Sequence, residues 1–310
     1  MFDILIIGGG PAGLTAALYA ARAGRKAAVL EKEFAGGQIV NSPLVENYPA
    51  IAAISGAEFA ENLQKQVEAL GVAFINEEAV QITKEGDLFT AATSRGRSYA
   101  ARTVILATGV SHRTLGLPAE EELIGAGISF CAVCDGAFYR GADVAVIGGG
   151  DTALQDALYL ANICRTVYIV HRRDAFRAAA QLVNRAREKE NIVLVTDSVP
   201  EEYLQEDNVV TGLAVKNKFT GERRELPVEG VFLAVGQVPQ SSFLSELVDL
   251  TPEGYIIAGE DCRTNIPGLF TAGDCRVKAV RQLTTAVGDG AVAALAACDL
   301  LDQEENEAQG

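Results

Sequence analysis

Ile4-Leu-Ile-Ile-Gly8-Gly-Gly-Pro-Ala-Gly13 is the stretch that decides the fold of this 310-residue chain. The short apolar run Ile4–Ile7 predicts a β-strand, and the glycines that follow predict a tight turn. Leu14–Ala23 has apolar residues at helical spacing, Gly24 ends that helix, and Lys26–Leu30 predicts the next strand. A strand–helix–strand unit of this kind favours a parallel sheet whose faces are covered by helices.

A second copy of this pattern lies in the middle of the chain. Its strand, turn, helix and second strand are predicted at Asp143–Ile147, Gly148–Ala153, Leu154–Asn162 and Thr166–Val170. Gly8 precedes Glu31 by 23 positions, and Gly148 precedes His171 by the same 23. The two copies predict an α/β protein with two Rossmann-like nucleotide-binding domains, not a solenoid.

Further segments complete the expected organisation. Val104–Leu106 and Val231–Val235 are apolar runs that predict strands. The helix expected after Arg281 is rich in Ala and Gly, so it can approach another backbone closely. The polar and acidic residues Asp302–Gly310 are expected to fray.

Composition places the chain among ordinary globular proteins and argues against some partners. The chain has 49% apolar and 22% charged residues, which is ordinary for a globular protein. Its 310 residues are enough for two domains. The net charge of −15 argues against nucleic acid as a partner. No apolar run approaches the roughly 18 residues that cross a bilayer. The N-terminus is read as a strand rather than a signal peptide, so we expect no membrane partner and a cytoplasmic location.

The first fingerprint, Gly8–Gly13, is typical of a dinucleotide site. Gly8 allows the sharp turn, Gly10 lets backbone approach a pyrophosphate, and Gly13 lets helix and strand pack. The helix N-terminus then offers N–H groups to the phosphates. Glu31 ends the second strand, where a carboxylate accepts from ribose hydroxyls and repels a 2′-phosphate, so the site suits FAD or NAD. The alternative is a Gly-rich loop and a solvated glutamate.

The second fingerprint is followed by basic residues instead. His171, Arg172 and Arg173 stand where the first copy has Glu31, and Arg177 follows shortly after. Arginine binds phosphate through forked, charge-assisted hydrogen bonds, which a 2′-phosphate requires. This pattern predicts NADP binding. The alternative is a solvated basic surface before a helix.

Between the fingerprints lies the dithiol Cys131-Ala-Val-Cys134, followed by Asp135. The pair could form a structural disulfide, half of a metal site or a redox couple. A cytosolic location disfavours the first, and the chain offers no second C-x-x-C and only two histidines for a metal. As a redox couple the pair closes reversibly, and Asp135 could exchange a proton with it or merely form the turn before Gly136. The remaining cysteines are expected to be free, buried thiols: Cys164, Cys262, Cys275 and Cys298.

Together these residues resemble the low-molecular-weight thioredoxin reductase family over nearly the whole chain. The matching segments are Gly8–Gly13 with Glu31, Gly36–Gln38, Glu46–Pro49, Ala107–Gly109, Cys131–Gly136, Gly148–Ala153, His171–Arg177, Thr271–Asp274 and Arg281–Ala286. The chain departs from the family at Val133, where Thr is common, and at Ala50, where Gly is common. It also departs at Ala137, Gln155 and Gln240.

The resemblance implies two cofactors and a set of site residues. Those expected at FAD are Gly8, Gly10, Pro11, Ala12, Gly13, Glu31, Gly37, Gln38, Asn47, Thr108, Gly109, Gly273, Asp274, Arg281 and Gln282. Those expected at NADPH are Gly150, Asp151, Thr152, Ala153, His171, Arg172, Arg173 and Arg177. Cys134 would face the flavin, Cys131 would attack the partner's disulfide, and Asp135 would transfer the proton.

The resemblance also implies the domain order and the reaction. The FAD domain would comprise residues 1–113 and 242–310, with the NADPH domain inserted at 114–241, and the protein would be a homodimer. Electrons would pass from NADPH through FAD and the dithiol to thioredoxin. Because nicotinamide and disulfide need the same flavin edge, we expect the inserted domain to rotate about hinges near residues 110–116 and 238–244. Alternative functions are a flavin-dependent dithiol oxidase, a reductase fed by ferredoxin and a nucleotide-binding redox sensor.

Overall fold

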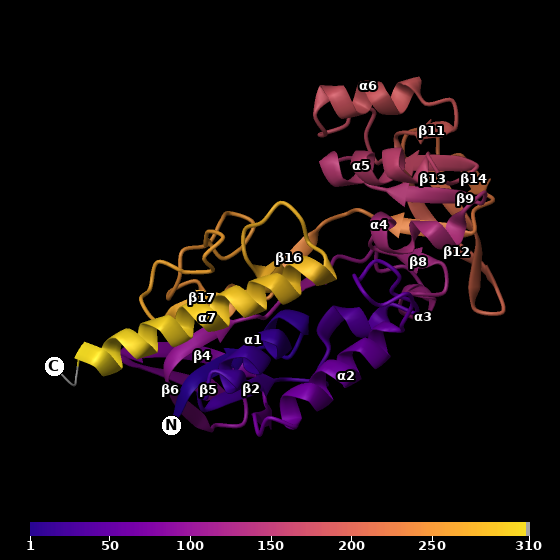
Figure 1. Ribbon diagram of the computed structural model, residues 1–310. Helices are drawn as coiled ribbons and strands as arrows, with labels where there is room; N and C mark the ends of the chain where they lie inside the picture. Colours follow the sequence, from indigo (N-terminus) through magenta and orange to yellow (C-terminus); the bar gives the residue numbers. More distant parts are fainter. Residues whose placement is uncertain (308–310) are drawn as a thin grey trace. The chain divides into compact units, whose positions relative to one another are not determined.

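The computed structural model describes residues 1–307, and the chain divides into two compact units. The larger unit comprises Met1–Ser111 and Val238–Gly310, and the smaller unit comprises His112–Gln237 (Figure 1). Along the chain, the smaller unit is therefore an insertion in the larger one. The boundaries expected from the sequence, after residues 113 and 241, lie within a few residues of these divisions.

A mixed sheet forms the centre of the larger unit. Its strands are β1 (Phe2–Ile7), β2 (Ala27–Glu31), β3 (Ala73–Asn76), β4 (Ala79–Glu85), β5 (Leu88–Thr93), β6 (Ser98–Leu106) and β17 (Leu269–Thr271). The strand order is β3-β2-β1-β6-β5-β4, and β17 also pairs with β6. The strands from β3 to β6 and the β6–β17 pair are parallel, whereas β5 and β4 continue the sheet antiparallel.

Two cores lie on opposite faces of this sheet because successive side chains of a strand point to opposite faces. Ile4 and Ile6 of β1 pack with the helical side, and Leu5 and Ile7 pack on the other side. The helices are α1 (Pro11–Arg22), α2 (Gly56–Glu68) and α7 (Leu283–Glu307), with short η1 (Gly37–Asn41), η3 (Ser242–Leu244) and η4 (Gly273–Cys275) in the connections. Figure 1 shows α7 alongside α1.

The smaller unit has a parallel sheet with different elements packed on its two faces. The sheet order is β11 (Ile192–Val195), β10 (Thr166–Val170), β9 (Asp143–Ile147), β15 (Gly230–Leu233) and β8 (Ile128–Ser129). One face packs against α5 (Asp151–Leu160) and α6 (Ala180–Glu188). The other packs against the antiparallel sheet β12 (Ser198–Glu206), β13 (Val209–Asn217) and β14 (Arg223–Leu226).

Short elements complete this part of the chain. They are α3 (Glu120–Leu123), α4 (Ala132–Asp135), η2 (Gly136–Tyr139), β7 (Val110–His112) and β16 (Gln237–Pro239). Strands β7 and β16 pair with each other at the two points where the chain passes between the units. Glu120 fixes the segment after β7, because its carboxylate accepts from the backbone N–H groups of residues 115, 116 and 117 and from the hydroxyl of Tyr203.

The internal repeat predicted from the sequence is present in the register of both parallel sheets. Ile7 pairs with Leu30 in the larger unit, and Ile147 pairs with Val170 in the smaller unit. The residues that follow are Gly8 and Glu31 in one copy and Gly148 and His171 in the other. The α/β fold class is therefore confirmed, and the structure places Glu31 and His171 at equivalent positions.

Both fingerprint helices begin earlier than the apolar pattern predicts. Leu14 and Leu154 are the first residues with helical periodicity, but α1 begins at Pro11 and α5 at Asp151. The first turns contain small or polar residues such as Ala12, Asp151 and Thr152 instead of large apolar ones, so the apolar pattern does not reveal them. Pro11 occupies the first turn, where its missing N–H costs nothing.

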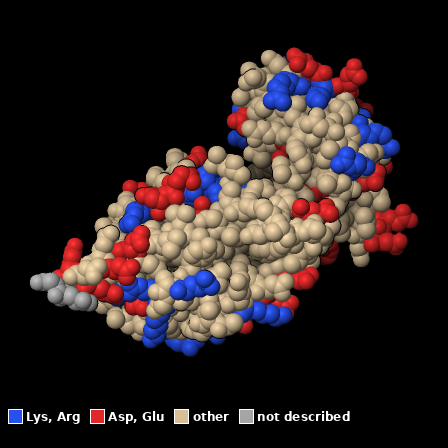
Figure 2. All heavy atoms as spheres, viewed as in Figure 1, with Lys and Arg blue, Asp and Glu red and all other residues tan. Residues whose placement is uncertain are grey.

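Two expectations for the C-terminal region are wrong. Asp302–Glu307 belongs to α7 instead of fraying, while residues 308–310 lie outside the described residues. Arg25 pairs with Asp302 and Glu305, and Arg102 also pairs with Glu305, so the acidic turn is held to the larger unit. Figure 2 shows acidic and basic atoms together where the chain ends.

Helix α7 is also long and apolar enough, by length and composition, to cross a membrane, contrary to the sequence analysis. Its hydropathy comes from many small residues rather than from one strongly apolar run. Ala293, Ala297 and Leu301 of this helix are buried in the core shared with α1, and core helices of this kind meet the same length and composition criteria.

Two glycines of α7 allow a direct test of its close approach to α1. A Cβ on Gly290 would overlap the backbone carbonyl of Ala12, whereas a Cβ on Gly288 would meet nothing within 4 Å. We expect Gly290→Ala to destabilise the protein by about 1–3 kcal/mol through overpacking. Gly288→Ala should stabilise it by up to about 1 kcal/mol, because Ala is the better helix former. Urea unfolding of both variants measures these changes in unfolding free energy. Changes of the same sign in the two variants would contradict the close approach of α7 to α1 at Gly290.

Candidate active site

The turns after β1, β6 and β17 lie together at one edge of the sheet in the larger unit. Ile7, Leu106 and Thr271 end these strands, and Leu106 pairs with both of the others. Ligands of α/β proteins bind beyond the carboxyl ends of parallel strands. The segments at this edge are Gly8–Gly13, Ala107–Gly109 and Ala272–Asp274, which include most residues expected at FAD.

The three fingerprint glycines of the larger unit differ in the structural reason for glycine at each position. Gly8 has a φ of 106°, and a Cβ there would overlap the carbonyl of Ala107. A Cβ on Gly13 would overlap the carbonyl of Gly8, so this glycine allows the helix to pack on the turn. Gly10 has an ordinary φ of −72°, and the nearest atom to its added Cβ is 4.0 Å away. The described chain itself does not require Gly10, which fits a position that a phosphate approaches.

Glu31 is held where the sequence analysis expects a ribose acceptor. Its Oε2 accepts from the backbone N–H of Gly9 at 2.6 Å, and its Oε1 accepts from that of Glu33 at 3.0 Å. Each carboxylate oxygen has a further lone pair. Glu31 is therefore oriented by the chain and retains acceptor capacity for hydroxyl groups.

The second fingerprint repeats this arrangement in the smaller unit. Gly148 has a φ of 156°, and a Cβ there would lie 2.5 Å from the carbonyl oxygen of Ala234. Gly150 has an ordinary φ, and its added Cβ meets no described atom within 4 Å. Ala153, in place of the third glycine, is fully buried. Asp151 and Thr152 lie in the first turn of α5, and both are exposed.

The basic segment after β10 folds back onto this fingerprint. The ring of His171 is buried, lies against Gly149 and stacks on Phe176 with centroids 5.2 Å apart. The Arg177 N–H donates to the Gly149 carbonyl at 2.8 Å, and Asp151 Oδ1 accepts from the Ala179 N–H at 2.7 Å. These contacts fix the loop that carries the arginines.

The charges of this loop favour an anion. Arg172, Arg173 and Arg177 are exposed, and within residues 1–307 none of them forms an ion pair with a carboxylate. Burial lowers the pKa of His171, and the three guanidinium groups lower it further, against a backbone hydrogen bond to Ala175. His171 and the backbone of this loop are fixed in the fold, whereas the three guanidinium groups are exposed, so binding of a 2′-phosphate here stays a prediction beside the alternative of a solvated basic surface.

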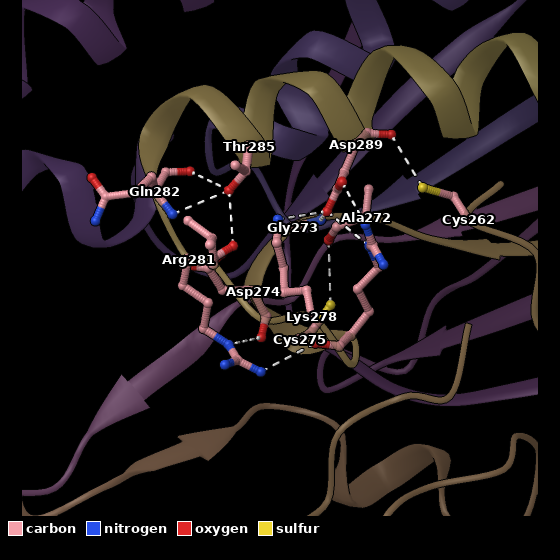
Figure 3. A network of polar contacts seen from close by, with 12 residues as sticks. Cys262, Ala272, Gly273, Asp274, Cys275, Lys278, Arg281, Gln282, Thr285 and Asp289 are labelled. Carbon is pink, nitrogen blue, oxygen red and sulfur yellow. Dashed lines mark hydrogen bonds and ion pairs between the residues drawn. The ribbon is translucent and has the colours of Figure 1, made fainter. Parts of the chain in front are cut away.

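Asp274 lies in η4 at the edge of the larger sheet (Figure 3). Burial raises the pKa of its carboxyl, against the positive charges of Lys278 and Arg281. Arg281 donates from Nε to the Asp274 carbonyl at 3.2 Å, and its guanidinium lies 4.2 Å from the ring centroid of Tyr255. Arg281 therefore binds the Asp274 backbone rather than the carboxylate.

Other residues expected at FAD come from distant parts of the sequence. Asn47 donates from Nδ2 to Gln282 Oε1 at 3.3 Å, although 235 positions separate the two residues. Gly37 lies against Gly10, because its added Cβ would be 3.3 Å from the Gly10 Cα. Gln38 is exposed in η1. Ala50 has a φ of 68°, in the left-handed region, which explains why the resembling family prefers Gly at this position.

Cys131 and Cys134 form a disulfide with a Cα–Cα distance of 5.3 Å. The backbone N–H of Cys134 donates to the Cys131 sulfur at 3.2 Å, and Cys131 caps the short helix α4. Asp135 accepts from the hydroxyl of Ser129 at 2.6 Å through Oδ2. Burial raises the pKa of Asp135, and this hydrogen bond acts in the opposite direction. Asp135 is thus a buried carboxyl beside a redox-capable sulfur pair.

Buried polar atoms without partners test whether these residues fit the expected cofactors. Among residues 1–307, the buried side-chain atoms without a hydrogen-bond partner are Thr108 Oγ1, Asp135 Oδ1, His171 Nε2 and Asp274 Oδ1. All four belong to residues that the sequence assigns to a cofactor or to catalysis. Buried polar groups in folded proteins are normally hydrogen-bonded, so these atoms fit contacts with groups outside the chain. Thr108, His171 and Asp274 therefore fit a bound cofactor, and Asp135 fits a proton-exchanging role.

The remaining cysteines are free and buried, as predicted: Cys164, Cys262, Cys275 and Cys298. Burial raises the pKa of Cys164 to about 11, and that of Cys262 to about 12 with the negative charge of Asp289 adding to the effect. Such thiols stay protonated at neutral pH and pack as small apolar groups.

No pattern in the sequence predicts the buried charge network around Asp289 (Figure 3). Asp289, on α7, accepts from the Gly273 N–H at 3.0 Å and from Arg276 Nε and Nη2 at 2.9 and 2.8 Å. Lys278 adds a hydrogen bond at 2.9 Å. Asp289 thus fixes the turn that presents Asp274. Its sequence signal is weak, because one Asp in a small-residue helix has no motif around it.

The family model for pyridine nucleotide-disulphide oxidoreductases matches residues 2–290. The chain belongs to this family. Thioredoxin reductase of Listeria monocytogenes is 41% identical over 94% of this chain and 92% of its own length. A bifunctional thioredoxin reductase/thioredoxin of Mycobacterium leprae is 42% identical over 94% of this chain and 64% of its own length. The crystal structure of thioredoxin reductase from Streptococcus pyogenes superposes with a TM-score of 0.94, at 42% identity, over 98% of this chain and 99% of that one.

These similarities confirm the resemblance inferred from the sequence. The protein is an oxidoreductase of the flavoprotein disulfide reductase type, and the family implies a flavin and a pyridine nucleotide. The Cys131–Cys134 disulfide agrees with a redox-active pair.

Asp289→Asn tests whether the buried network stabilises the larger unit. Burial raises the pKa of Asp289, but Arg276 and Lys278 outweigh it and leave the pKa below its ordinary value. The substitution keeps the shape but leaves two buried cations without their anion, so we expect a loss of about 3–5 kcal/mol of unfolding free energy at pH 7. Urea unfolding measures this.

Glu260→Gln is the matched control, because Glu260 is exposed and lies 3.6 Å from the same Arg276. We expect a change of at most about 1 kcal/mol. Because the pKa of Asp289 is lowered, its stabilisation is present above the pKa of the unfolded chain and is lost as pH falls through the folded pKa, below about pH 4. Equal losses of unfolding free energy in the two variants would show that the buried ion pairs of Asp289 stabilise the protein no more than the exposed Glu260 does.

Proposed function

We propose that this protein is an NADPH-dependent thioredoxin-disulfide reductase that contains FAD. One observation carries the proposal: the chain combines the Cys131–Cys134 disulfide with two equivalent fingerprints whose ribose positions carry opposite charges, Glu31 in one and His171 with its arginines in the other. A carboxylate and a basic cluster select different nucleotides. Two nucleotides and a dithiol are the parts of an electron relay.

The larger unit would hold FAD. Its pyrophosphate would lie at Gly8–Gly13 and the N-terminus of α1, and its ribose at Glu31. Asp274 would bind the ribityl chain, and Gln282 would lie near the isoalloxazine ring. The unpartnered atoms Asp274 Oδ1 and Thr108 Oγ1 support this assignment, because a bound cofactor would supply their missing hydrogen bonds.

The smaller unit would hold NADPH. The open space beside Gly150 would admit the pyrophosphate, and Arg172, Arg173 and Arg177 would bind the 2′-phosphate. When bound, NADPH supplies a hydride and FAD carries the electron pair. The contribution of this chain would be to orient both nucleotides, to favour NADPH over NADH by binding the 2′-phosphate, and to move protons at the dithiol.

The dithiol would complete the reaction by thiol–disulfide exchange. The Cys131 thiolate attacks one sulfur of the partner's disulfide, and the Cys134 thiolate then attacks Cys131 to close the bond seen here. The backbone N–H of Cys134 donates to the Cys131 sulfur and would stabilise its thiolate. Asp135 would give a proton to the departing partner sulfur.

Thioredoxin is the proposed partner. The fusion of a thioredoxin reductase with a thioredoxin in the Mycobacterium leprae relative supports it. Val133, between the two cysteines, is 49% exposed, and Phe138, just after the dithiol, is 44% exposed. Together with Arg140 they would offer a local docking surface, because the net charge of −15 gives no long-range attraction to an acidic partner.

We further propose a cytoplasmic homodimer. Val292 and Leu295 of α7 are 40% and 49% exposed, which would give a second copy an apolar surface on this helix. The four free thiols fit a reducing compartment. Sedimentation velocity of the purified protein distinguishes a dimer from a monomer.

Rotation of the smaller unit is proposed between two half-reactions at one flavin. Glu120 binds the N–H groups of residues 115–117, so motion would concentrate before Leu115, around β7 and its partner β16. Such hinges are segments that absorb backbone changes while both units stay rigid.

Removing the basic cluster should change nucleotide preference. For Arg172→Ala/Arg173→Ala we expect the KM for NADPH to rise about 10- to 100-fold, because charge-assisted hydrogen bonds to the 2′-phosphate are lost. The KM for NADH should stay nearly constant. Flavin bleaching in a stopped-flow instrument measures both. Arg224→Ala, on β14 of the same unit, is the control and should keep the wild-type preference. An unchanged NADPH-to-NADH ratio in the double variant would exclude this site.

Cys134→Ser should separate cofactor binding from dithiol chemistry. We expect thioredoxin turnover to fall by at least about 10³-fold, while the bound flavin is retained. Cys164→Ala, which removes a buried free thiol from the same unit, should keep most of the turnover. Absorbance at the flavin bands and NADPH consumption with thioredoxin give the two readouts. Loss of flavin from Cys134→Ser, or retained turnover, would contradict the relay.

A further inference from the structure

Ser129 stands beside the dithiol without belonging to any motif of the sequence. It ends the short strand β8, and the pairing of Ser129 with Phe232 of β15 fixes its position in the parallel sheet. The residue is only 5% exposed. Strand pairing and burial therefore fix the position of this hydroxyl.

The hydroxyl of Ser129 contacts both the sulfur segment and the carboxyl group. It donates to Asp135 Oδ2 at 2.6 Å and accepts from the Cys131 N–H at 3.1 Å. The Cys131 carbonyl lies 3.5 Å away, at the limit of a hydrogen bond. A hydroxyl has one proton to donate, so Ser129 donates it to the closer acceptor, the carboxylate of Asp135, and not to the Cys131 carbonyl.

The Ser129 hydroxyl is the one hydrogen-bond donor that the described residues 1–307 offer to the side chain of Asp135. Asp135 Oδ1 is buried and has no partner among residues 1–307. The nearby titratable groups are Tyr139, whose pKa is raised to about 12 by burial and by Asp135 itself, and the two cysteines, which are joined in the disulfide. Tyr139 is therefore neutral at ordinary pH. The hydrogen bond of Ser129 opposes the rise in the Asp135 pKa that burial causes.

We propose that Ser129 is a positioning residue of the dithiol site, whose hydroxyl holds Asp135 by Oδ2 and leaves Oδ1 to exchange protons with the sulfurs. This proposal rests on the proposed function and deepens it. During exchange, the attacking thiolate forms a new S–S bond and the partner's S–S bond breaks. The departing sulfur takes the proton from Asp135 Oδ1, and the carboxylate that remains is stabilised by the Ser129 hydroxyl. Asp135 regains a proton when the second cysteine thiol becomes the attacking thiolate.

Ser129→Ala in the holoenzyme tests this role through the pH dependence of the reaction. Loss of a hydrogen bond to the charged carboxylate raises the pKa of Asp135 further. In each rate profile measured against pH, the midpoint that reflects the ionisation of Asp135 should therefore move up by about one pH unit. Two measurements report it: the pH profile of kcat/KM with thioredoxin, and the rate of iodoacetamide alkylation of the reduced dithiol against pH. Asp135→Asn should remove this midpoint from both profiles.

Two further variants separate positioning from general support of the fold. Ser129→Thr keeps a hydroxyl and should restore the wild-type midpoint. Ser198→Ala removes a hydroxyl that is also 5% exposed in the same unit but donates to the Thr196 carbonyl at 2.8 Å. It should leave both profiles unchanged. If Ser129→Ala proves too unstable, Ser129→Cys keeps the volume with a weak donor and should show the same upward shift.

A wild-type midpoint in Ser129→Ala or Ser129→Cys would overturn the proposal, even if stability fell. The alkylation profile uses protein reduced with dithiothreitol, so it requires neither NADPH nor thioredoxin. Absence of thioredoxin turnover in the wild-type protein would therefore refute the proposed function, whereas an unshifted alkylation profile would refute the role of Ser129.

Discussion

Both nucleotide sites depend on one steric constraint at the carboxyl ends of two parallel sheets. The turn after β1 packs on the carbonyl of Ala107, and the turn after β9 packs on that of Ala234, so closely that neither Gly8 nor Gly148 could carry a Cβ. Each turn thus lies against the residue that follows a neighbouring strand, and the helix begins three residues after the turn glycine, at Pro11 and at Asp151. Its N–H groups then face the sheet edge at which phosphates bind. Gly10 and Gly150 are free of this constraint, which supports the proposal that a phosphate approaches them.

Buried carboxylates in this protein differ in how completely the chain satisfies them. Asp289 has hydrogen bonds from a backbone N–H, a guanidinium and an ammonium, and its pKa is lowered despite burial. Asp135 has one donor, Ser129, and its pKa is raised. Asp274 Oδ1 has no partner, and its pKa is raised too. A carboxylate that the chain satisfies is fixed in one charge state and serves structure, whereas a partly satisfied one is able to exchange protons or bind a ligand.

Sequence patterns predicted the parts of the fold that depend on local periodicity. The strands at Asp143–Ile147 and Thr166–Val170 have the bounds expected from their apolar runs, and the spacing of 23 residues between glycine and ribose residue appears in the register of both sheets. Tertiary contacts decided what the patterns missed. The acidic residues Asp302–Glu307 remain helical because Arg25 and Arg102, far away in the sequence, bind them.

The same contrast explains which site residues the sequence could reveal. Motifs identified Thr108, Asp135, His171 and Asp274, and each has a buried polar atom without a partner among residues 1–307. A buried unsatisfied group costs about 1–3 kcal/mol, so the chain alone gains nothing from these residues at these positions. A bound cofactor would offset that cost at Thr108, His171 and Asp274, which supports the proposed function.

Ser129 and Asp289 are different, because their partners lie within the chain and their roles arise from the strand pairing and helix packing that bring those partners together. No local pattern encodes such a contact, since a serine at the end of a strand and an aspartate on a small-residue helix are common in proteins that have neither role. Motifs in the sequence thus predict the residues proposed to bind a ligand, whereas the residues that orient them become visible only when the chain is folded.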